Sequence, residues 1–268
     1  MVSTSKNRTV WKSAAARRLL KMAGNPPAVE EAVRIVANGL LEGVHGPPTD
    51  LEAIGPRLNI SEFRSEDIPI SGELCRDENG FKVVFSSYLS LERRRFTIAH
   101  EIGHAVFEAT GKNCPRIGTE LERLCDMLAT EIIMPRDQFL KSLPDEVSVR
   151  MVFDLARTFQ ASISATAIRC AELLGISAFE VENKRVPWSY GVVRKGEIIG
   201  LDYDLKCTVE EAIANSGTGS KVIFLHNNVW NGLWNLEWAC IGQNGRALFM
   251  LQPITTSIVE AKKKFSLL

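Results

Sequence analysis

The sequence lacks three features that would point to particular partners: an excess of one charge, a long apolar run and paired cysteines. Among its 268 residues, Lys plus Arg and Asp plus Glu each number 32, so no net field attracts nucleic acid or an anionic membrane. No segment approaches the roughly 18 apolar residues of a membrane span, and the basic first residues contain no apolar signal region. We therefore expect a cytoplasmic protein with no membrane partner.

Cysteine is present but not in metal-binding or disulfide patterns. The six cysteines are scattered along the chain, and no two of them form a CxxC pair. This spacing argues against a cysteine-rich zinc module and favours reduced thiols over a disulfide framework.

Periodicity and composition predict an α+β protein in several parts. A polar, basic start predicts a flexible arm, and a mostly helical region with one clear strand, "FKVVFSS", follows it. Two shorter helical patterns come next, and then strands around one capped helix, including a hairpin at Asn244-Gly245. The expected parts are the arm at 1–25, the helical region at 26–143, the helix pair at 144–184 and an α+β domain at 185–268.

A His-Glu-x-x-His pattern lies inside "RRRFTIAHEIGHAVFEA", in a chain with only four histidines. On a helix, His100 and His104 are one turn apart and project from the same face, so both imidazoles can bind one zinc ion. Glu101 lies about 100° around the helix, where its carboxylate can take a proton from a water that the ion activates. Apolar neighbours would bury both histidines, and a shared metal satisfies buried imidazoles well.

A zinc site of this kind needs a third protein ligand, and a carboxylate is expected because no further histidine lies nearby. Glu122 and Asp126 share one face of the next predicted helix, which suits Glu122 as ligand and Asp126 as the acceptor that orients a histidine. The alternatives are that Glu122 completes a capping box with Thr119, and that Asp126 is a solvated helix residue. Glu120 and Glu131 are rival ligands.

Three ordered motifs give the chain a family resemblance. "RRRFTIAHEIGHAVFE", then "ERLCDMLATEIIMP", then "LARTFQASISATAIRCAEL" resemble the ImmA/IrrE family of zinc metallopeptidases over about residues 50–180. The resemblance implies that His100, His104 and Glu122 bind Zn²⁺, and that Glu101 is the catalytic base. It also implies a mainly helical, zincin-like (gluzincin-type) domain with a small sheet at 26–143, and that Cys125 is a small packed residue.

The same resemblance implies the biology. It implies site-specific cleavage of a helix-turn-helix repressor, relieving repression in a mobile-element or stress-response circuit. Some relatives carry a C-terminal GAF-like domain, with which the α+β pattern of 185–268 is compatible. The competing class is a non-catalytic regulator whose zinc scaffold binds DNA, a ligand or a repressor without cleaving it, and the intact Glu101 weighs against it.

Several other features have a structural and a functional interpretation. The segment 144–184 resembles a helix-turn-helix, but it lacks the customary glycine and offers only Arg157 and Arg169 as basic candidates, so DNA contact is not favoured. Tryptophans at every fourth residue, 230 to 238, are interpreted as core rather than a ligand surface. Tyr88 and His45 are candidates to stabilise an oxyanion, and neither is assigned.

Overall fold

The computed structural model describes residues 11–109, 118–191, 193, 195–198, 201–226, 231–241 and 246–254. The chain divides into two compact units, residues 1–136 with 159–161, and the rest. The expected Asn244-Gly245 turn lies outside the described residues.

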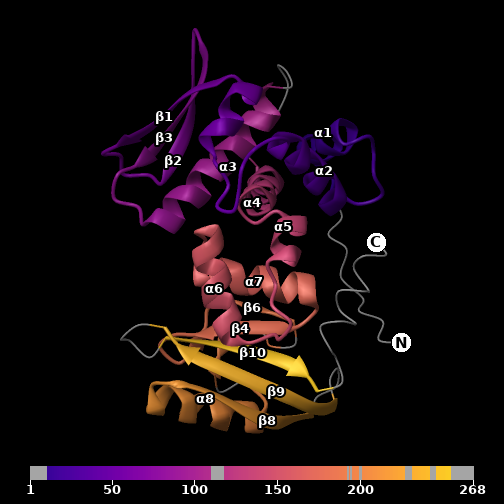
Figure 1. The fold of residues 1–268 in the computed structure, drawn as a ribbon, viewed down its shortest axis with the longest axis vertical. Helices are drawn as coiled ribbons and strands as arrows, with labels where there is room; N and C mark the ends of the chain where they lie inside the picture. Colours follow the sequence, from indigo (N-terminus) through magenta and orange to yellow (C-terminus); the bar gives the residue numbers. More distant parts are fainter. Residues whose placement is uncertain are drawn as a thin grey trace. The chain divides into compact units, whose positions relative to one another are not determined.

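The first unit is a layer of helices beside a small sheet (Figure 1). Its sheet has three strands in the order β1-β3-β2. The central strand β3 pairs in parallel with β1 and antiparallel with β2. The elements are α1 Ala14–Met22, α2 Val29–Leu41, the 3-10 helix η1 Glu52–Leu58, β1 Ile60–Glu66, β2 Gly72–Asp77, β3 Gly80–Ser86, α3 Leu91–Ala109 and α4 Thr119–Ile133.

The strand β3 matches the apolar "FKVVFSS" pattern and forms the buried middle of the sheet. Val83, Val84 and Phe85 are all buried, as expected of a strand flanked on both sides. The helix α3 packs against β2 and β3 on one side and against α4 on another. The core of this unit therefore lies around α3, which carries the histidine pair.

The expected flexible arm at 1–25 contains a helix, which the sequence analysis missed. Residues 14–22 form α1, whose Ala15, Ala16 and Leu19 are fully buried. Ser13 caps this helix by accepting a hydrogen bond from the amide of Ala16. Burial of the apolar face against α2 and α4 orders a segment whose basic residues suggested an arm.

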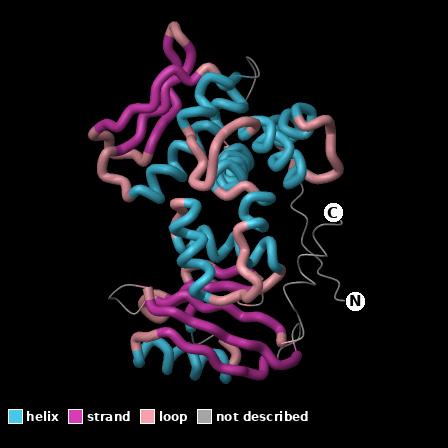
Figure 2. The backbone as a smooth tube through the Cα atoms, viewed as in Figure 1, coloured by secondary structure: helices cyan, strands magenta, loops and turns pink. Residues whose placement is uncertain are grey.

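The second unit is an antiparallel sheet with helices on both faces, α6 and α7 on one and α8 on the other (Figures 1 and 2). The sheet runs β6-β4-β10-β9-β8. Its elements are α6 Val149–Phe159, α7 Ile163–Leu174, β4 Ser177–Val181, β5 Arg185–Val186, β6 Ser189–Tyr190, β7 Gly196–Glu197, α8 Tyr203–Asn215, β8 Thr218–His226, β9 Asn231–Cys240 and β10 Ala247–Pro253; the short α5 Arg136–Lys141 precedes them.

The C-terminal sheet starts earlier than the sequence suggested. The strand β4 lies within the expected helical segment 144–184, yet it pairs along its whole length with β10. All of β4 is buried, including the polar Ser177 and Glu180, so the strand lacks the alternation of buried and exposed residues that would have indicated it in the sequence. The proposed boundary near residue 185 therefore falls inside this sheet's first hairpin.

The helix pair α6 and α7 has a three-residue connection, in which Gln160 takes the left-handed conformation with a φ of 49°. Gln160 itself adopts the conformation for which glycine is customary, so the turn forms without a glycine. Arg169 is 3% exposed and pairs with Glu172, whereas the exposed Arg157 pairs with Asp154. Of the two basic candidates for DNA contact, one is thus buried.

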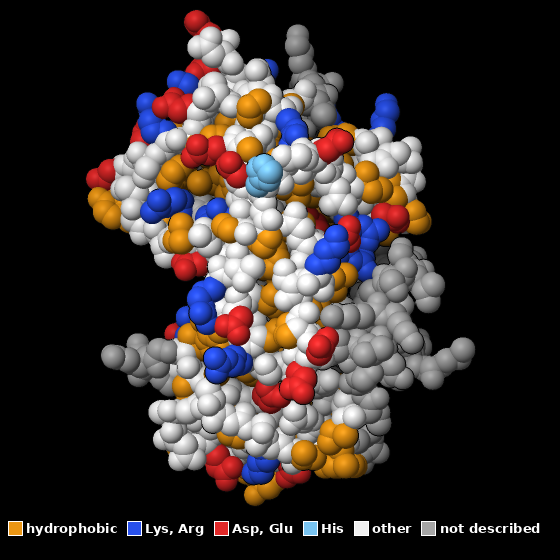
Figure 3. Space-filling view, viewed as in Figure 1, with side chains coloured by type: hydrophobic (Ala, Val, Ile, Leu, Met, Phe, Trp, Pro, Cys, Tyr) orange, Lys and Arg blue, Asp and Glu red, His pale blue; other side chains and the backbone are white. Residues whose placement is uncertain are grey.

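The mixed surface charges and the buried tryptophans agree with what the sequence composition predicts. Acidic and basic side chains are interspersed on the face shown in Figure 3. Trp234 is buried in the core of the second unit and Trp238 packs against that core, while Trp230 lies outside the described residues. Within the described part of the chain, the helices include none long and apolar enough to cross a membrane.

Candidate metal centre

The helix α3 presents the two histidines on one face. It begins after Ser90, whose hydroxyl accepts a hydrogen bond from the amide of Arg93. His100 and His104 then follow one turn apart, with side chains 18% and 19% exposed. Their Nε2 atoms are 3.1 Å apart, so both rings direct the same nitrogen at one point.

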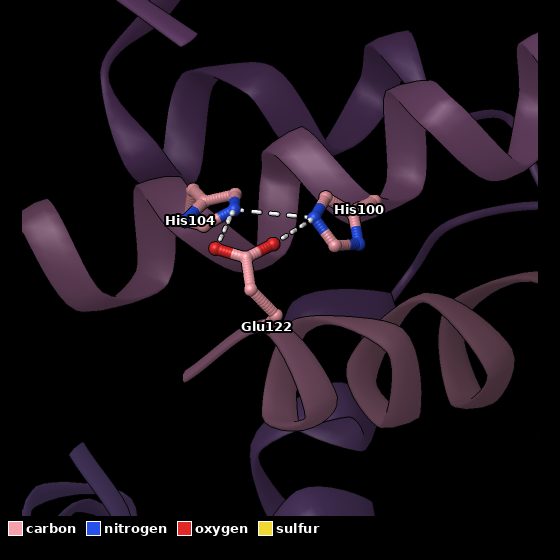
Figure 4. Close-up of side chains that lie close together, drawn as sticks. All are labelled: His100, His104 and Glu122. Atoms are coloured by element: carbon pink, nitrogen blue, oxygen red, sulfur yellow. Dashed lines mark hydrogen bonds and ion pairs between the residues drawn. The ribbon is translucent and has the colours of Figure 1, made fainter. Parts of the chain in front are cut away.

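Glu122 reaches the same point from the first turn of α4 (Figure 4). One carboxylate oxygen lies 3.2 Å from Nε2 of His100, and the other lies 3.6 Å from Nε2 of His104. The three side chains thus offer ligand atoms that all lie within 4.8 Å of one another. A tetrahedral zinc with bonds of about 2.1 Å separates its ligands by about 3.4 Å, so the cluster fits that ion.

Asp126 lies one turn beyond Glu122 and contacts the far side of a histidine. Its carboxylate is 2.9 Å from Nδ1 of His100. A hydrogen bond from Nδ1 fixes the ring and leaves Nε2 free to bind a metal. This is the arrangement that the sequence analysis predicted for a carboxylate that orients a ligand histidine.

The electrostatics of the histidine pair favour one shared positive charge. Burial opposes protonation of His100, but the hydrogen bond to Asp126 and the nearby carboxylates outweigh it and raise the pKa of His100. Burial and the charge on His100 together lower the pKa of His104. The two rings therefore do not readily carry a positive charge each, and one metal cation shared by the two Nε2 atoms would satisfy both.

Glu101 lies beside the ligands rather than among them. It is 8% exposed, and its carboxylate accepts a hydrogen bond from the amide of Leu74 in β2. Burial, with the charges of Glu122 and Glu73, raises the pKa of Glu101 to about 7 despite the opposing charge of His100. A carboxyl group with a pKa near neutrality can both accept and return a proton.

The neighbouring acids differ in the contacts that they make. The N-cap of α4 is Gly118 and makes no side-chain cap, so Thr119 and Glu122 do not form a capping box. Glu120 instead accepts hydrogen bonds from the amides of Lys12 and Ser13, at the start of α1. Glu131 is buried and accepts from the amide of Arg136, at 3.3 Å. Neither rival belongs to the cluster.

A cleft of about 840 Å³ opens over the cluster. It is lined by β2, by the face of α3 that carries the histidines, and by Leu121, Glu122 and Asp126 of α4. Tyr88 and His45 are not among its lining residues, and Tyr88 is 76% exposed. The structure therefore places neither candidate where it could stabilise an oxyanion.

Two glycines permit the close approach of the elements around the cluster. A Cβ on Gly103 would lie 3.0 Å from Cα of Cys125, where α3 crosses α4. A Cβ on Gly72 would lie 2.5 Å from the methyl carbon of Thr97, where β2 approaches α3. Sequence reasoning missed both glycines and the amide of Leu74, because only tertiary contacts define them; Cys125 is the small packed residue that was expected.

Known proteins share both the sequence pattern and the fold of this chain. The fold and site define an α+β protein with a two-histidine, one-carboxylate cluster. Residues 52–171 match the peptidase M78 family, described as the IrrE N-terminal-like domain. This match supports the resemblance to the ImmA/IrrE family that the three motifs carry. The family indicates a metallopeptidase-like or regulatory role.

A solved structure extends the comparison beyond that domain. The chain is similar to a structure titled Mycobacterium tuberculosis transcriptional regulator, with a TM-score of 0.53 and 14% identity. The alignment covers 82% of this chain and 76% of that one. At this identity the likeness concerns the fold alone. No curated protein sequence matches the chain significantly.

Proposed function

We propose that this protein is a zinc-dependent endopeptidase that cleaves a helix-turn-helix transcriptional repressor. The observation that carries the proposal is the combination, in one open cleft, of three convergent ligand atoms and a buried carboxyl group that is not a ligand. His100, His104 and Glu122 would hold the zinc. The repressor as substrate, and the mobile-element or stress-response circuit, come from the family resemblance.

Each residue of the site would have a separate role in peptide hydrolysis. A bound zinc would acidify a water and polarise the scissile carbonyl. Glu101 accepts a proton from the attacking water and delivers it to the leaving amine. The amide of Leu74 holds the Glu101 carboxylate in place, and Asp126 holds the His100 ring with Nε2 facing the cleft.

The proposal extends to the domain organisation. We propose a zincin-like metallopeptidase domain at 26–143 and helix-turn-helix-like helices at 144–184 that dock the repressor. The C-terminal domain, with its start moved back to β4, is proposed to be GAF-like, which the antiparallel sheet with helices on both faces supports. The cytoplasmic location stays a prediction.

The test is a paired cleavage and binding assay with the repressors encoded near this gene. Zinc-loaded wild type should cut one of them at one site, and Glu101→Gln should bind that repressor without cutting it. Glu92→Gln is the matched control, because it makes the same change in the first turn of α3 outside the cleft. If wild type and Glu101→Gln both bind a repressor tightly and leave it whole, the protein is a non-catalytic zinc-scaffold regulator instead.

A further inference from the structure

One of the three ligand residues lies where its helix begins. Glu122 is in the first turn of α4, and its amide bonds to the carbonyl of Gly118 at 3.0 Å. The amides before it have no partner within the helix, and Gly118 has no side chain that could cap them. Helix ends of this kind fray readily. Any contact that restrains this turn therefore helps to fix the Glu122 carboxylate in place.

Residues 11–13 hold this turn through its neighbouring acid, Glu120. One carboxylate oxygen of Glu120 accepts hydrogen bonds from the amides of Lys12 and Ser13, at 3.2 and 2.9 Å. The hydrogen bonds from Ser13, together with the one from Lys12, lower the pKa of Glu120 below its ordinary value. The acceptor is thus a charged carboxylate, and hydrogen bonds to a charged group are stronger than those between neutral groups.

A second contact joins the same two segments. The guanidinium carbon of Arg123 lies 5.1 Å from the ring centre of Trp11, within the range of a cation–π contact. Arg123 lies three residues after Glu120, so both contacts are on one face of α4. Glu122 and Asp126 line the cleft from a different face. The N-terminal segment therefore contacts α4 on both sides of Glu122 in the sequence, without entering the cleft.

The segment that makes these contacts is itself anchored. Ser13 caps α1 by accepting from the amide of Ala16, and the apolar face of α1 is buried against α2 and α4. The ring of Trp11 is half-buried, and its Nε1 atom has no hydrogen-bond partner in the part of the chain that the structure describes. Packing and the contact with Arg123 thus set the position of this ring, rather than a hydrogen bond.

Building on the proposed zinc endopeptidase function, we propose that residues 11–13 form a clamp that holds the first turn of α4 and thereby positions Glu122 for metal binding. Trp11 and Glu120 are positioning residues, because neither belongs to the ligand cluster and each acts through the backbone of α4. The clamp precedes the segment that matches the family, which begins at residue 52. Part of the support of the metal centre therefore lies in the segment whose composition suggested a flexible arm.

The experiment measures the zinc affinity of the full chain by competition with a chromophoric chelator, at a temperature where every variant is folded. Trp11→Ala and Glu120→Ala should each weaken zinc binding by about fivefold, less than the roughly ten- to hundredfold cost of losing a residue that contacts a ligand directly. Trp11→Phe keeps a ring beside Arg123, and Glu120→Gln keeps an acceptor oxygen. Both should bind zinc within about twofold of wild type.

Hydrogen exchange of the metal-free protein tests the route through the helix. The amide of Glu122 should exchange about fivefold faster in Trp11→Ala and in Glu120→Ala than in wild type, because the first turn opens more often. Met22→Ala is the matched control, since it shortens a large, partly exposed side chain at the opposite end of α1 and should change neither exchange nor zinc affinity.

Reduced thermal stability with unchanged zinc affinity, in both Trp11→Ala and Glu120→Ala, would overturn the clamp and leave residues 11–13 with a structural role alone. An equal loss of zinc affinity in Met22→Ala would overturn it as well.

Zinc affinity and cleavage together separate this inference from the proposed function. If wild type binds zinc and cuts no repressor, while Trp11→Ala and Glu120→Ala bind zinc more weakly, the endopeptidase proposal fails and the clamp stands. If wild type cuts a repressor, and both variants bind zinc and cut as wild type does, the clamp fails and the endopeptidase proposal stands.

Discussion

Glu122 is the residue on which the metal centre depends, because it joins two helices that are separate in sequence. His100 and His104 share α3 and need only helical periodicity to meet, whereas Glu122 comes from α4. Its carboxylate contacts both imidazoles and makes no cap. Helical spacing left open whether Glu122 binds metal or caps its helix, and the contacts of its side chain favour the metal-binding role.

We predict that Glu122→Gln weakens zinc binding by roughly a hundredfold or more, since even changes to residues behind the ligands cost ten- to a hundredfold. Competition with a chromophoric chelator measures the affinity. Glu120→Gln is the matched control: it should leave zinc affinity unchanged and lower the free energy of unfolding only slightly, because Glu120 accepts hydrogen bonds from the amides of Lys12 and Ser13, just before α1. Retention of zinc by Glu122→Gln, with reduced stability, would contradict the assignment.

Glu101 should make the metal-free protein less stable as the pH rises. The folded state holds this carboxyl group at a pKa of about 7, chiefly by burial, above the ordinary value near 4.5. Between these values the folded state binds more protons than the unfolded state, so stability falls with increasing pH. At pH 8, metal-free Glu101→Gln should therefore exceed wild type by up to about 3 kcal/mol.

Urea unfolding of both metal-free proteins at pH 5 and pH 8 measures this effect. The stability difference between Glu101→Gln and wild type should be small at pH 5 and appear by pH 8. Zinc should reduce it, because a nearby cation favours the ionised carboxylate. A constant difference at both pH values would show that Glu101 does not titrate in this range.

The sequence predicted the residues of the cluster better than their surroundings. The histidine pair, Glu122 and Asp126 follow from helical spacing together with metal chemistry. Leu74 and Gly72 could not be predicted, since their roles depend on β2 approaching α3 from another part of the chain. Periodicity carries no information about such tertiary approaches.

At the scale of elements, the crossing of α3 and α4 sets the distance between the histidines and Glu122. Gly103 lies at this crossing against Cys125, and both are buried. A larger residue at either position would separate the helices, since the packed interior leaves no space to absorb a methyl group. The small residues of the two motifs therefore serve the metal geometry.

We predict that Gly103→Ala lowers zinc affinity and fails to stabilise the protein. Alanine in place of glycine normally stabilises a helix by about 1 kcal/mol. Gly39→Ala in α2, where nothing lies within 4 Å of the added Cβ, should show that gain and bind zinc normally. Thermal unfolding and zinc titration of both variants test this. Equal gains in stability with unchanged zinc affinity would mean that the helices adjust freely.

Elements with clear apolar patterns were predictable, except for α1, whose basic residues suggested an arm, and charge-rich strands were not. The long helices, β3 and the C-terminal hairpin strands follow from apolar patterns. The strands β1 and β2 carry many charged residues and lie at sheet edges, where such residues are typical. The parallel pairing of β1 with β3 is equally invisible in the sequence, because it joins strands that are not neighbours in the chain.

At the scale of the whole molecule, the metal centre belongs to one of the two units. All five proposed site residues lie between residues 100 and 126, within the first unit. The second unit has its own core, formed by residues from β4 to β10 and from α8. Each unit therefore contains the packing needed for its own stability, and a change deep in the second should leave zinc binding intact.

Glu180 allows this independence to be tested. Its side chain is 3% exposed in β4, and it accepts hydrogen bonds from Arg246, Ser164 and Trp188. These bonds lower the pKa of Glu180 although burial opposes ionisation. Glu180→Gln removes the charge that pairs with Arg246, and because the Arg246 side chain is 39% exposed, the loss should be about 1 to 2 kcal/mol, below that of a fully buried pair.

The expected result is a selective loss in the second unit. Glu180→Gln should lower the unfolding temperature of one transition, while zinc affinity and the transition that zinc stabilises stay unchanged. Glu211→Gln is the control, because its ion pair with Lys221 is exposed and contributes at most about 1 kcal/mol. Calorimetry with and without a chelator separates the transitions. A parallel loss of zinc affinity in Glu180→Gln alone would show that the units are coupled, and that the second unit helps to hold the metal centre in its binding geometry.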